Sequence, residues 1–429
     1  MTSSKKRIAL LFTVFTILCV GFTHPSQLVY KLEALLVAAA AFRLFYERFF
    51  KKDPLSPSAR DEALTLALIV LCGTLVRLMI AREGYGNYDS RSWEIAAEAF
   101  VRGQNIYTAT ERYMYSPVWF WTIGFLEKIH GIFPQYSLST CIRFFLTLVD
   151  AVTLLPLLAV ASRSGISRQN TALLFYMNPV SFLLTGYHAQ FENLALLFLF
   201  IGLWGFFCRE IRPSFRTAWL WFFSTVSFIV KHNIFYEVIV VLNFAVRRPW
   251  VRAALFLVSC AAFLASFLLY REGGSEQILR HVFLYSSYPL KYGVGLLTQA
   301  AWPKFFFILG LFLYPFFLKS KDLLERLLSV LLFFLVFTTG VGVQYFVLPI
   351  ALGALRPARG FFIYSAVTTA YLLGSYWNLG IAAFAWVPLW TVWVAAAYWW
   401  MTLSIHSEAS QSSGFPRGRV HAVEKKPRQ

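Results

Sequence analysis

Apolar runs separated by short basic stretches make up most of the chain. The first three runs cover about residues 8–22, 28–45 and 63–80, and a helix needs about 20 apolar residues to cross a hydrocarbon core of about 30 Å. The later runs lie near residues 138–160, 171–186, 194–208, 217–230, 234–246, 253–270, 303–318, 327–340, 345–355, 361–374 and 380–401. This pattern predicts an all-α polytopic membrane protein with about 12 to 14 transmembrane helices. Several runs are short for a perpendicular helix, so we expect broken or partly re-entrant segments that line a cavity.

Composition and charge support this class. Apolar residues make up 58% of the 429 residues, charged residues only 14%, and the mean hydropathy is +0.59. A net charge of +18 would suggest a nucleic-acid partner in a soluble chain. Here the cations fall in short clusters between apolar runs, a pattern that sets membrane orientation, and we expect no nucleic-acid partner. The five cysteines lie singly in apolar segments, which predicts neither a disulfide framework nor a zinc site.

The basic clusters also predict topology and domain boundaries. Residues 1–62 are expected to form an N-terminal pair of spans with a linker, residues 63–403 the main membrane domain, and residues 404–429 a basic tail. By the positive-inside rule both termini are cytoplasmic, and the segment 84–137 lies on the opposite, outer face. The run 118–129 has only about 12 residues, too few to span, and is expected to lie along the outer surface. Trp119 and Trp121 would then sit at headgroup level.

The longest polar run, from Gly84 to Tyr115, carries the first candidate for chemistry. Asp89 follows Asn87 by two residues and precedes a segment with apolar residues at helical spacing, which Gly103 and Asn105 close. Asp89 is therefore expected in cap position. A carboxylate that only caps this helix, at about 1 kcal/mol, is the simplest alternative to a catalytic role.

Further polar residues fall on the same predicted face, where ionisable groups next to apolar sequence point to function. They are His188, Gln190, Glu192 and Asn193; Lys231, His232 and Asn233; Arg280, His281, Tyr285, Tyr288 and Lys291; and Gln344 and Tyr345. Three of these groups have a structural alternative: a snorkelling helix end for Lys231, a helix-end pair for His188 with Glu192, and interhelical hydrogen bonding for Gln344 with Tyr345. Arg143 and Asp150, seven residues apart in one run, suggest a structural ion pair or interhelical partners.

Several motifs carry a resemblance to a known family. The run from Tyr85 to Pro117 has an acidic residue, an aromatic-rich helix, then G-x-x-x-Y and Y-x-Y-[ST]-P. N-P-V-S at 178–181, G-Y-H-A-Q-F-E-N at 186–193, the Lys231 turn, H-V-F-L-Y-S-S-Y at 281–288 and Q-Y-F-V-L-P at 344–349 follow. Together they resemble the GT-C superfamily of multispanning glycosyltransferases, in particular GPI mannosyltransferase I and bacterial polyprenol-phosphate-dependent mannosyltransferases.

The resemblance implies an inverting glycosyltransferase. It would move one sugar, mannose in the enzymes that the motifs resemble, from a polyprenyl-phosphate donor to a lipid-linked or glycan acceptor within membrane lipid. The site would face the periplasm of a bacterial inner membrane or the lumen of the ER. The family's D-x-D is Asn87-x-Asp89 here, so metal dependence is left open with no cofactor expected, as is the need for a partner subunit.

Asp89 matches the catalytic aspartate of that family. One carboxylate suffices for such a reaction, because a polyprenyl phosphate leaves without protonation while the acceptor hydroxyl must lose a proton. The candidates for holding the donor phosphate are Lys231, Arg280, His281 and Lys291. The candidates for binding substrate are Asn87, Arg91, Tyr115, His188, Gln190, Glu192, His232, Tyr285, Gln344 and Tyr345. A transporter or lipid flippase is the alternative class, although the chain shows no convincing internal repeat.

Overall fold

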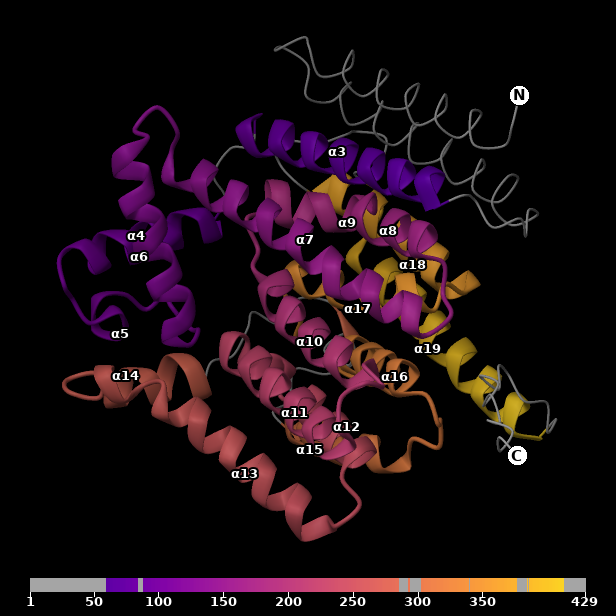
Figure 1. The fold of residues 1–429 in the computed structure, drawn as a ribbon. Coiled ribbons are helices and arrows are strands. Elements are labelled where there is room, and N and C mark those ends of the chain that lie inside the picture. Colours follow the sequence, from indigo (N-terminus) through magenta and orange to yellow (C-terminus); the bar gives the residue numbers. More distant parts are fainter. Residues whose placement is uncertain are drawn as a thin grey trace, which may run out of the picture.

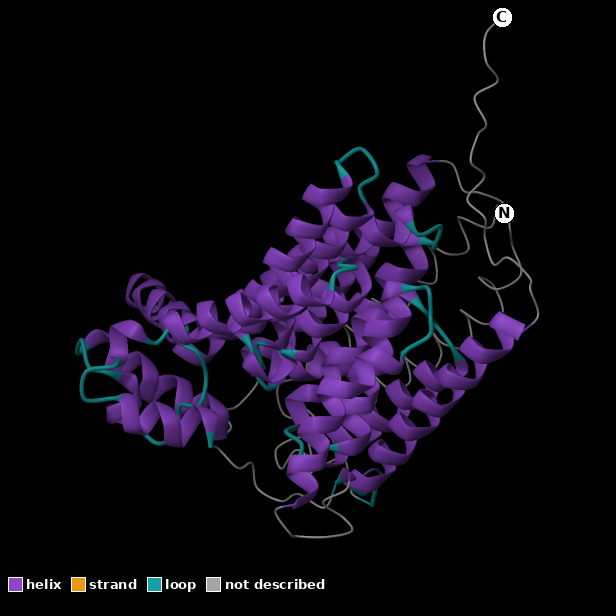
Figure 2. Cartoon of the chain, turned by 90° about the horizontal axis from the view of Figure 1, so that it is seen from below, coloured by secondary structure: helices purple, strands orange, loops and turns teal. Residues whose placement is uncertain are grey.

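A computed structural model describes residues 59–83, 88–284, 292–293, 302–338, 340–375, 384 and 386–412. Throughout these ranges the chain forms helices joined by loops, and no strand occurs in them (Figure 2). The all-α class predicted from the sequence is therefore confirmed. The predicted first two spans and the end of the basic tail lie outside the described residues.

The helices follow one another closely along the chain (Figure 1). They are α3 (Ala59–Glu83), α4 (Tyr88–Val101), α5 (Ile106–Ala109), α6 (Pro117–Ile132), α7 (Leu138–Arg163), α8 (Arg168–Tyr176), α9 (Pro179–Phe182), α10 (Glu192–Phe207), α11 (Pro213–Val230), α12 (Tyr236–Ala245), α13 (Pro249–Ala265), α14 (Ser275–Ile278), α15 (Trp302–Phe317), α16 (Leu323–Phe337), α17 (Leu348–Leu355), α18 (Arg359–Ser375) and α19 (Leu389–Ser412). Two π-helical turns, η2 (Leu183–Tyr187) and η5 (Leu279–Phe283), and three 3-10 turns, η3 (His232–Ile234), η4 (Leu268–Tyr270) and η7 (Val343–Val347), lie between them.

Three of the described helical segments are long and apolar enough to cross a membrane. They are Glu62–Ala81, Leu138–Arg163 and Pro249–Tyr270, and each matches a span expected from the sequence. Shorter apolar helices occur at Glu192–Phe207, His232–Ala245, Lys304–Phe317 and Val343–Leu355. These lengths agree with an all-α membrane protein, while the count of about 12 to 14 spans stays a prediction.

Local sequence explains where many helices begin. Ser137 and Ser167 cap α7 and α8, because each side chain accepts a hydrogen bond from a backbone amide of the first turn. Asn178 caps α9 in the same way, and Pro179 follows at the first helical position, where the absence of its N–H costs nothing. The N-P-V-S motif is thus a helix start.

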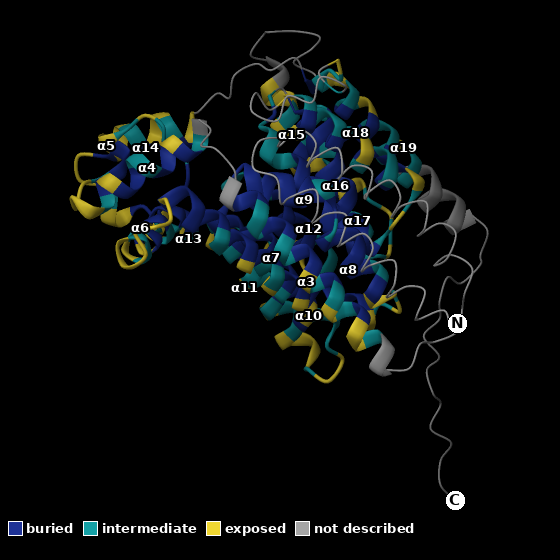
Figure 3. Ribbon diagram, turned by 90° about the horizontal axis from the view of Figure 1, so that it is seen from above, coloured by how far each residue is buried: buried dark blue, intermediate teal, exposed yellow. Residues whose placement is uncertain are grey.

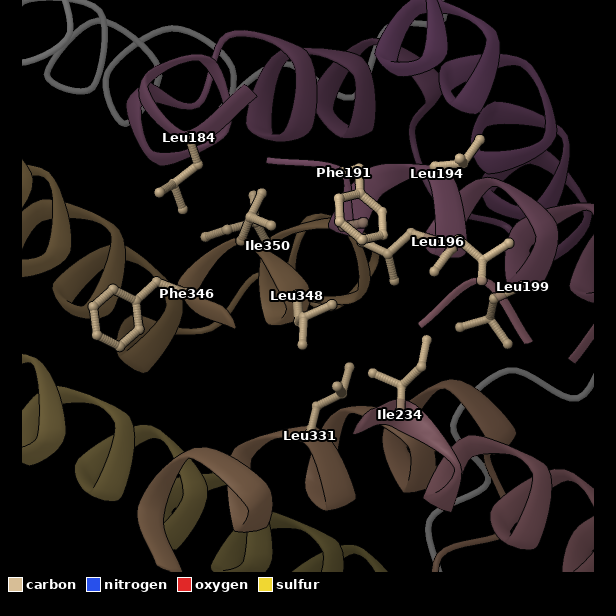
Figure 4. Packing of buried hydrophobic residues seen from close by; sticks show 14 of the residues in the cluster. Leu184, Phe191, Leu194, Leu196, Leu199, Ile234, Leu331, Phe346, Leu348 and Ile350 are labelled. Atoms are coloured by element: carbon tan, nitrogen blue, oxygen red, sulfur yellow. The ribbon is translucent and has the colours of Figure 1, made fainter. Parts of the chain in front are cut away.

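The helices form a tightly packed bundle and a smaller lobe beside it. In Figure 3 the helices α4, α5, α6 and α14 lie in this lobe, while α7, α10, α12, α16 and α17 lie in the bundle. Helix α10 packs against α7 and α11, α3 against α7 and α8, and α19 against α16 and α18. Figure 4 shows the centre of the bundle, where Phe191, Ile234, Leu331 and Leu348 come together from distant parts of the chain.

Helix α6 corrects one prediction. It has 16 residues, so it remains short for a membrane span, as expected. However, Trp119 is completely buried and stacks on Phe191 with ring centroids 4.3 Å apart. Only Trp121 is exposed, and its indole N–H donates to the hydroxyl of Tyr270 at 2.7 Å. Protein, rather than lipid headgroups, surrounds Trp119, because α6 packs against α4 and α7.

The run expected to span at 171–186 is broken, as its shortness suggested. Helix α8 ends at Tyr176, α9 has four residues, and the turn η2 leads to Tyr187. All residues from 180 to 196 are buried. Irregular backbone at membrane depth is tolerated where protein surrounds it, and this segment meets that condition.

Candidate active site

Three separate parts of the chain meet around Asp89. Asp89 lies in the first turn of α4, Gln190 lies in the turn before α10, and Lys231 ends α11. The side-chain amide of Gln190 donates a hydrogen bond to Oδ2 of Asp89 at 2.7 Å. Helices α10 and α11 form an antiparallel hairpin, so the start of the first and the end of the second lie at the same end of the bundle. This meeting point includes residues that the sequence predicted to share one face.

A buried ion pair lies next to this contact. The ammonium of Lys231 is 2.7 Å from Oε1 of Glu192, and both side chains are fully buried. Glu192 lies in the first turn of α10, and Lys231 follows the last residue of α11. Each charge therefore has the sign that the adjacent helix dipole favours. Within the part of the chain that the structure describes, the second carboxylate oxygen of Glu192 has no hydrogen-bond partner.

Aromatic rings enclose the ammonium of Lys231. The ring centroids of Phe191 and Tyr115 lie 4.2 and 4.3 Å from it, and that of Tyr345 lies 5.8 Å away. Cation–π attraction strengthens when the cation is removed from water, as it is here. The Tyr345 hydroxyl also contacts the side-chain amide of Asn233. Tyr115 and Tyr345 thus belong to the same cluster as Lys231, with Tyr345 also making the interhelical hydrogen bond considered as its structural alternative.

Burial changes the acidity of Asp89. Removal from water raises the pKa of its carboxyl above the ordinary value, and this effect outweighs the hydrogen bond from Gln190 and the positive charges of Lys231 and Arg112, which lower it. A carboxylate with a raised pKa accepts a proton more readily. Position and environment therefore make Asp89 suited to act as a base, in addition to any role in starting α4.

The backbone that presents Gln190 is strained. Ala189 has a φ of +56°, the left-handed region that residues other than glycine rarely adopt, and it is the one such residue in the described ranges. It directly follows η2, and π-helical turns often occur at functional sites. Such strain persists only where the surrounding structure holds it in place.

The remaining predicted site residues have different positions. Arg91 is exposed and forms a surface ion pair with Glu94 at 2.8 Å, so it points away from Asp89. Arg280 is exposed and His281 partly buried, and within the described residues no ion pair or hydrogen bond joins either to Asp89 or Lys231. Asn87, Tyr285 and Lys291 lie outside the described residues.

The histidines and Gln344 flank the cluster. His188 is buried immediately after η2, and its carbonyl oxygen lies 3.5 Å from the side-chain amide nitrogen of Gln190. The ring of His232 lies 5.9 Å from that of Phe263. Gln344 is partly buried in η7, next to Tyr345. All three lie in segments that border the site.

The structure decides between the two alternatives that the sequence left open for Asp150. Its Oδ2 pairs with Nε of Arg77 at 3.0 Å, while Arg143 donates to the carbonyl oxygen of Tyr187 at 2.9 Å. Of the two alternatives left open for Arg143 and Asp150, the structure favours partners outside α7 for each residue over an ion pair between them. Arg77 was overlooked despite a usable signal, namely an arginine inside an apolar run. Arg112, which acts electrostatically on Asp89, carried no comparable signal.

The described residues offer no metal centre, and comparison with known proteins adds no relative. The described residues contain no group of three or more His, Cys, Asp or Glu side chains that could hold a metal ion, and Asn87 is not among them. Comparison with protein-family models, with curated proteins and with solved structures found no match for this chain. The GT-C resemblance therefore remains a prediction from sequence motifs.

Proposed function

We propose that the protein is an inverting glycosyltransferase of the GT-C type that uses Asp89 as a general base. The observation that carries the proposal is the half-buried carboxylate of Asp89, held by Gln190 at 2.7 Å and close to the charges of Lys231 and Arg112. An apolar, helical chain with a carboxylate placed to act as a base fits the transfer of a sugar from a polyprenyl-phosphate donor. The multispanning architecture and the periplasmic or lumenal location belong to the same proposal.

In the proposed reaction Asp89 takes the proton of the acceptor hydroxyl. The acceptor oxygen attacks the anomeric carbon from the face opposite the phosphate, the bond between that carbon and the phosphate oxygen breaks, and its electron pair leaves with the phosphate. Inversion follows from this single displacement. Positive charge near the phosphate stabilises the leaving group as its negative charge develops.

The ion pair with Glu192 modifies the role predicted for Lys231. Its charge is already compensated at 2.7 Å, so a donor phosphate can use it fully only if Glu192 releases it. Arg112 is partly buried, and its Nε donates to the hydroxyl of Ser92 at 3.1 Å on the same helix as Asp89. Under the proposal, Arg112 and Lys231 together provide the positive field next to the base.

The decisive experiment compares Asp89→Asn with Glu94→Gln in membranes given radiolabelled polyprenyl-phosphate sugars. Asn keeps an oxygen that can accept from Gln190 and can support the helix start, but it cannot take a proton. Turnover should fall by a factor of about 10² or more in Asp89→Asn while donor binding survives. Glu94 lies on the same helix but is exposed, so Glu94→Gln should retain wild-type turnover.

An Asp89→Asn variant with near wild-type turnover would exclude Asp89 as the base. If the wild-type protein transfers no sugar from mannose, glucose or arabinose donors, the enzyme proposal fails as a whole. Transport of a lipid-linked substrate would then be the function to test.

A further inference from the structure

Asp150 is the centre of a buried polar network that no part of the proposed mechanism uses. Its Oδ2 pairs with Arg77 of α3 at 3.0 Å, and both side chains are completely buried. Its Oδ1 accepts from the side-chain amide of Asn193, in the first turn of α10. The same amide donates to the hydroxyl of Thr185 in η2 at 3.0 Å. Asp150 thus connects α3 and α7 to both ends of the segment 185–193.

The segment 185–193 contains the residue that contacts Asp89. Gln190 lies three residues before Asn193, with the strained Ala189 beside it. The backbone N–H of Gln190 donates to the carbonyl oxygen of Leu184 at 3.1 Å, and the backbone N–H of His188 donates to that of Leu183 at 3.0 Å. The segment has no regular helix of its own at this point, so side chains from neighbouring helices must hold it.

Two arginines satisfy the carbonyl groups that the broken helix leaves open. Nη1 of Arg77 donates to Tyr176 O at 2.6 Å, at the end of α8, and Nη2 donates to the hydroxyl of Ser181 at 3.0 Å. Nε of Arg143 donates to Tyr187 O at 2.9 Å, at the end of η2. Buried carbonyls without a partner are costly, so these contacts support the irregular path of the backbone.

We propose that Asp150, with Arg77, Asn193 and Thr185, positions Gln190 against Asp89. The proposal rests on the proposed function, because it assigns a purpose to the position of Gln190. A buried ion pair is often no more stabilising than apolar residues of the same volume, so a network spanning four elements points to the selection of one conformation. None of the four residues contacts Asp89 in the structure, so they are positioning residues that act through the segment 185–193.

Thr185 offers the mildest test of the network. Thr185→Val keeps the side-chain shape and removes the oxygen that accepts from Asn193, while Thr185→Ser keeps the hydroxyl. Thr153→Val is the matched control, because the Thr153 hydroxyl is also buried but, among the described residues, donates only to Val149 O of its own helix, at 2.7 Å. The pH profile of sugar transfer and the hydrogen exchange of residues 187–193 are measured for all three variants and for Gln190→Ala.

Gln190→Ala should move the acid limb of the rate profile upward by about one to two pH units, because it removes a hydrogen bond from an ionised carboxylate beside Lys231 and Arg112. Thr185→Val should shift it in the same direction and should add nothing when combined with Gln190→Ala. Thr185→Ser should restore the wild-type profile. The 187–193 amides should exchange faster in Thr185→Val than in Thr153→Val.

Equal exchange in the two valine variants would overturn the positioning role, as would an unshifted pH profile in Thr185→Val when exchange is faster. If the wild-type protein transfers no sugar, the proposed function fails, and the hydrogen-exchange experiment alone decides whether the network holds the segment 185–193. Faster exchange in Thr185→Val then supports a network that holds the segment 185–193, and equal exchange refutes it.

Discussion

The ion pair between Lys231 and Glu192 gives a prediction whose size can be worked out from the structure. At 2.7 Å the attraction between the two charges is about 6 kcal/mol at an effective dielectric constant of about 20. Desolvation of two fully buried charges cancels much of it, so the net stabilisation by the intact pair is small. Removing only one partner is different, because the other charge stays buried without compensation.

We therefore expect Lys231→Met and Glu192→Gln each to lower the free energy of unfolding by about 3–5 kcal/mol. Lys231→Met should be the more harmful, since it also removes the cation–π contacts with Phe191 and Tyr115 and leaves a buried carboxylate. The double variant should lose much less than the sum of the two single losses, because it leaves no unpaired charge.

The assay is unfolding in mixed detergent micelles, followed by circular dichroism as the denaturing detergent is titrated. Arg91→Gln serves as the control, since it breaks the exposed pair with Glu94 and should not change stability measurably. Two single variants that each lose less than about 1 kcal/mol and combine additively would refute the reasoning. Such a result would mean that water reaches the pair and screens it.

Three further predictions concern other parts of the molecule. Because burial raises the pKa of Asp89, the folded state binds its proton more tightly than the unfolded state, and the wild type loses stability as the pH rises through that pKa. Asp89→Asn should therefore be the more stable protein at neutral pH, and this difference should disappear in acid. A difference in melting temperature that stays constant with pH would contradict this. Gly73→Ala should lower the free energy of unfolding by about 1–3 kcal/mol, since the added Cβ would lie 2.5 Å from Cδ1 and 3.2 Å from the carbonyl oxygen of Tyr176. An unchanged free energy of unfolding would show that α3 and α8 can separate freely. In a background without native cysteines, Gln104→Cys should react with an impermeant thiol reagent from outside and Ser214→Cys should not, and the reverse pattern would overturn the predicted orientation.

Much of the local structure could be read from the sequence. Apolar runs predicted the helices near 63–80, 138–160 and 253–270, since burial in an apolar environment requires backbone hydrogen bonds within each segment. Asn178 followed by Pro179 marks the start of α9 through hydrogen bonding within a few residues. The sequence also indicated Asp89 and Lys231 as candidate functional residues, because placing ionisable residues beside apolar runs costs free energy and usually points to a function.

The partners of these charges depended on the tertiary structure. Asp150 pairs with Arg77, 73 residues away, and not with Arg143 on its own helix. Lys231 is neutralised by Glu192, which lies at the start of a different helix, and spacing along the chain does not give that contact. The surface pair of Arg91 with Glu94, three residues apart on α4, is by contrast a local contact that helical spacing allows. Helical periodicity depends on neighbours within a few positions, so sequence determines it directly. Which charges meet in the interior depends on how distant helices pack and on where they break, and only the folded chain decides that.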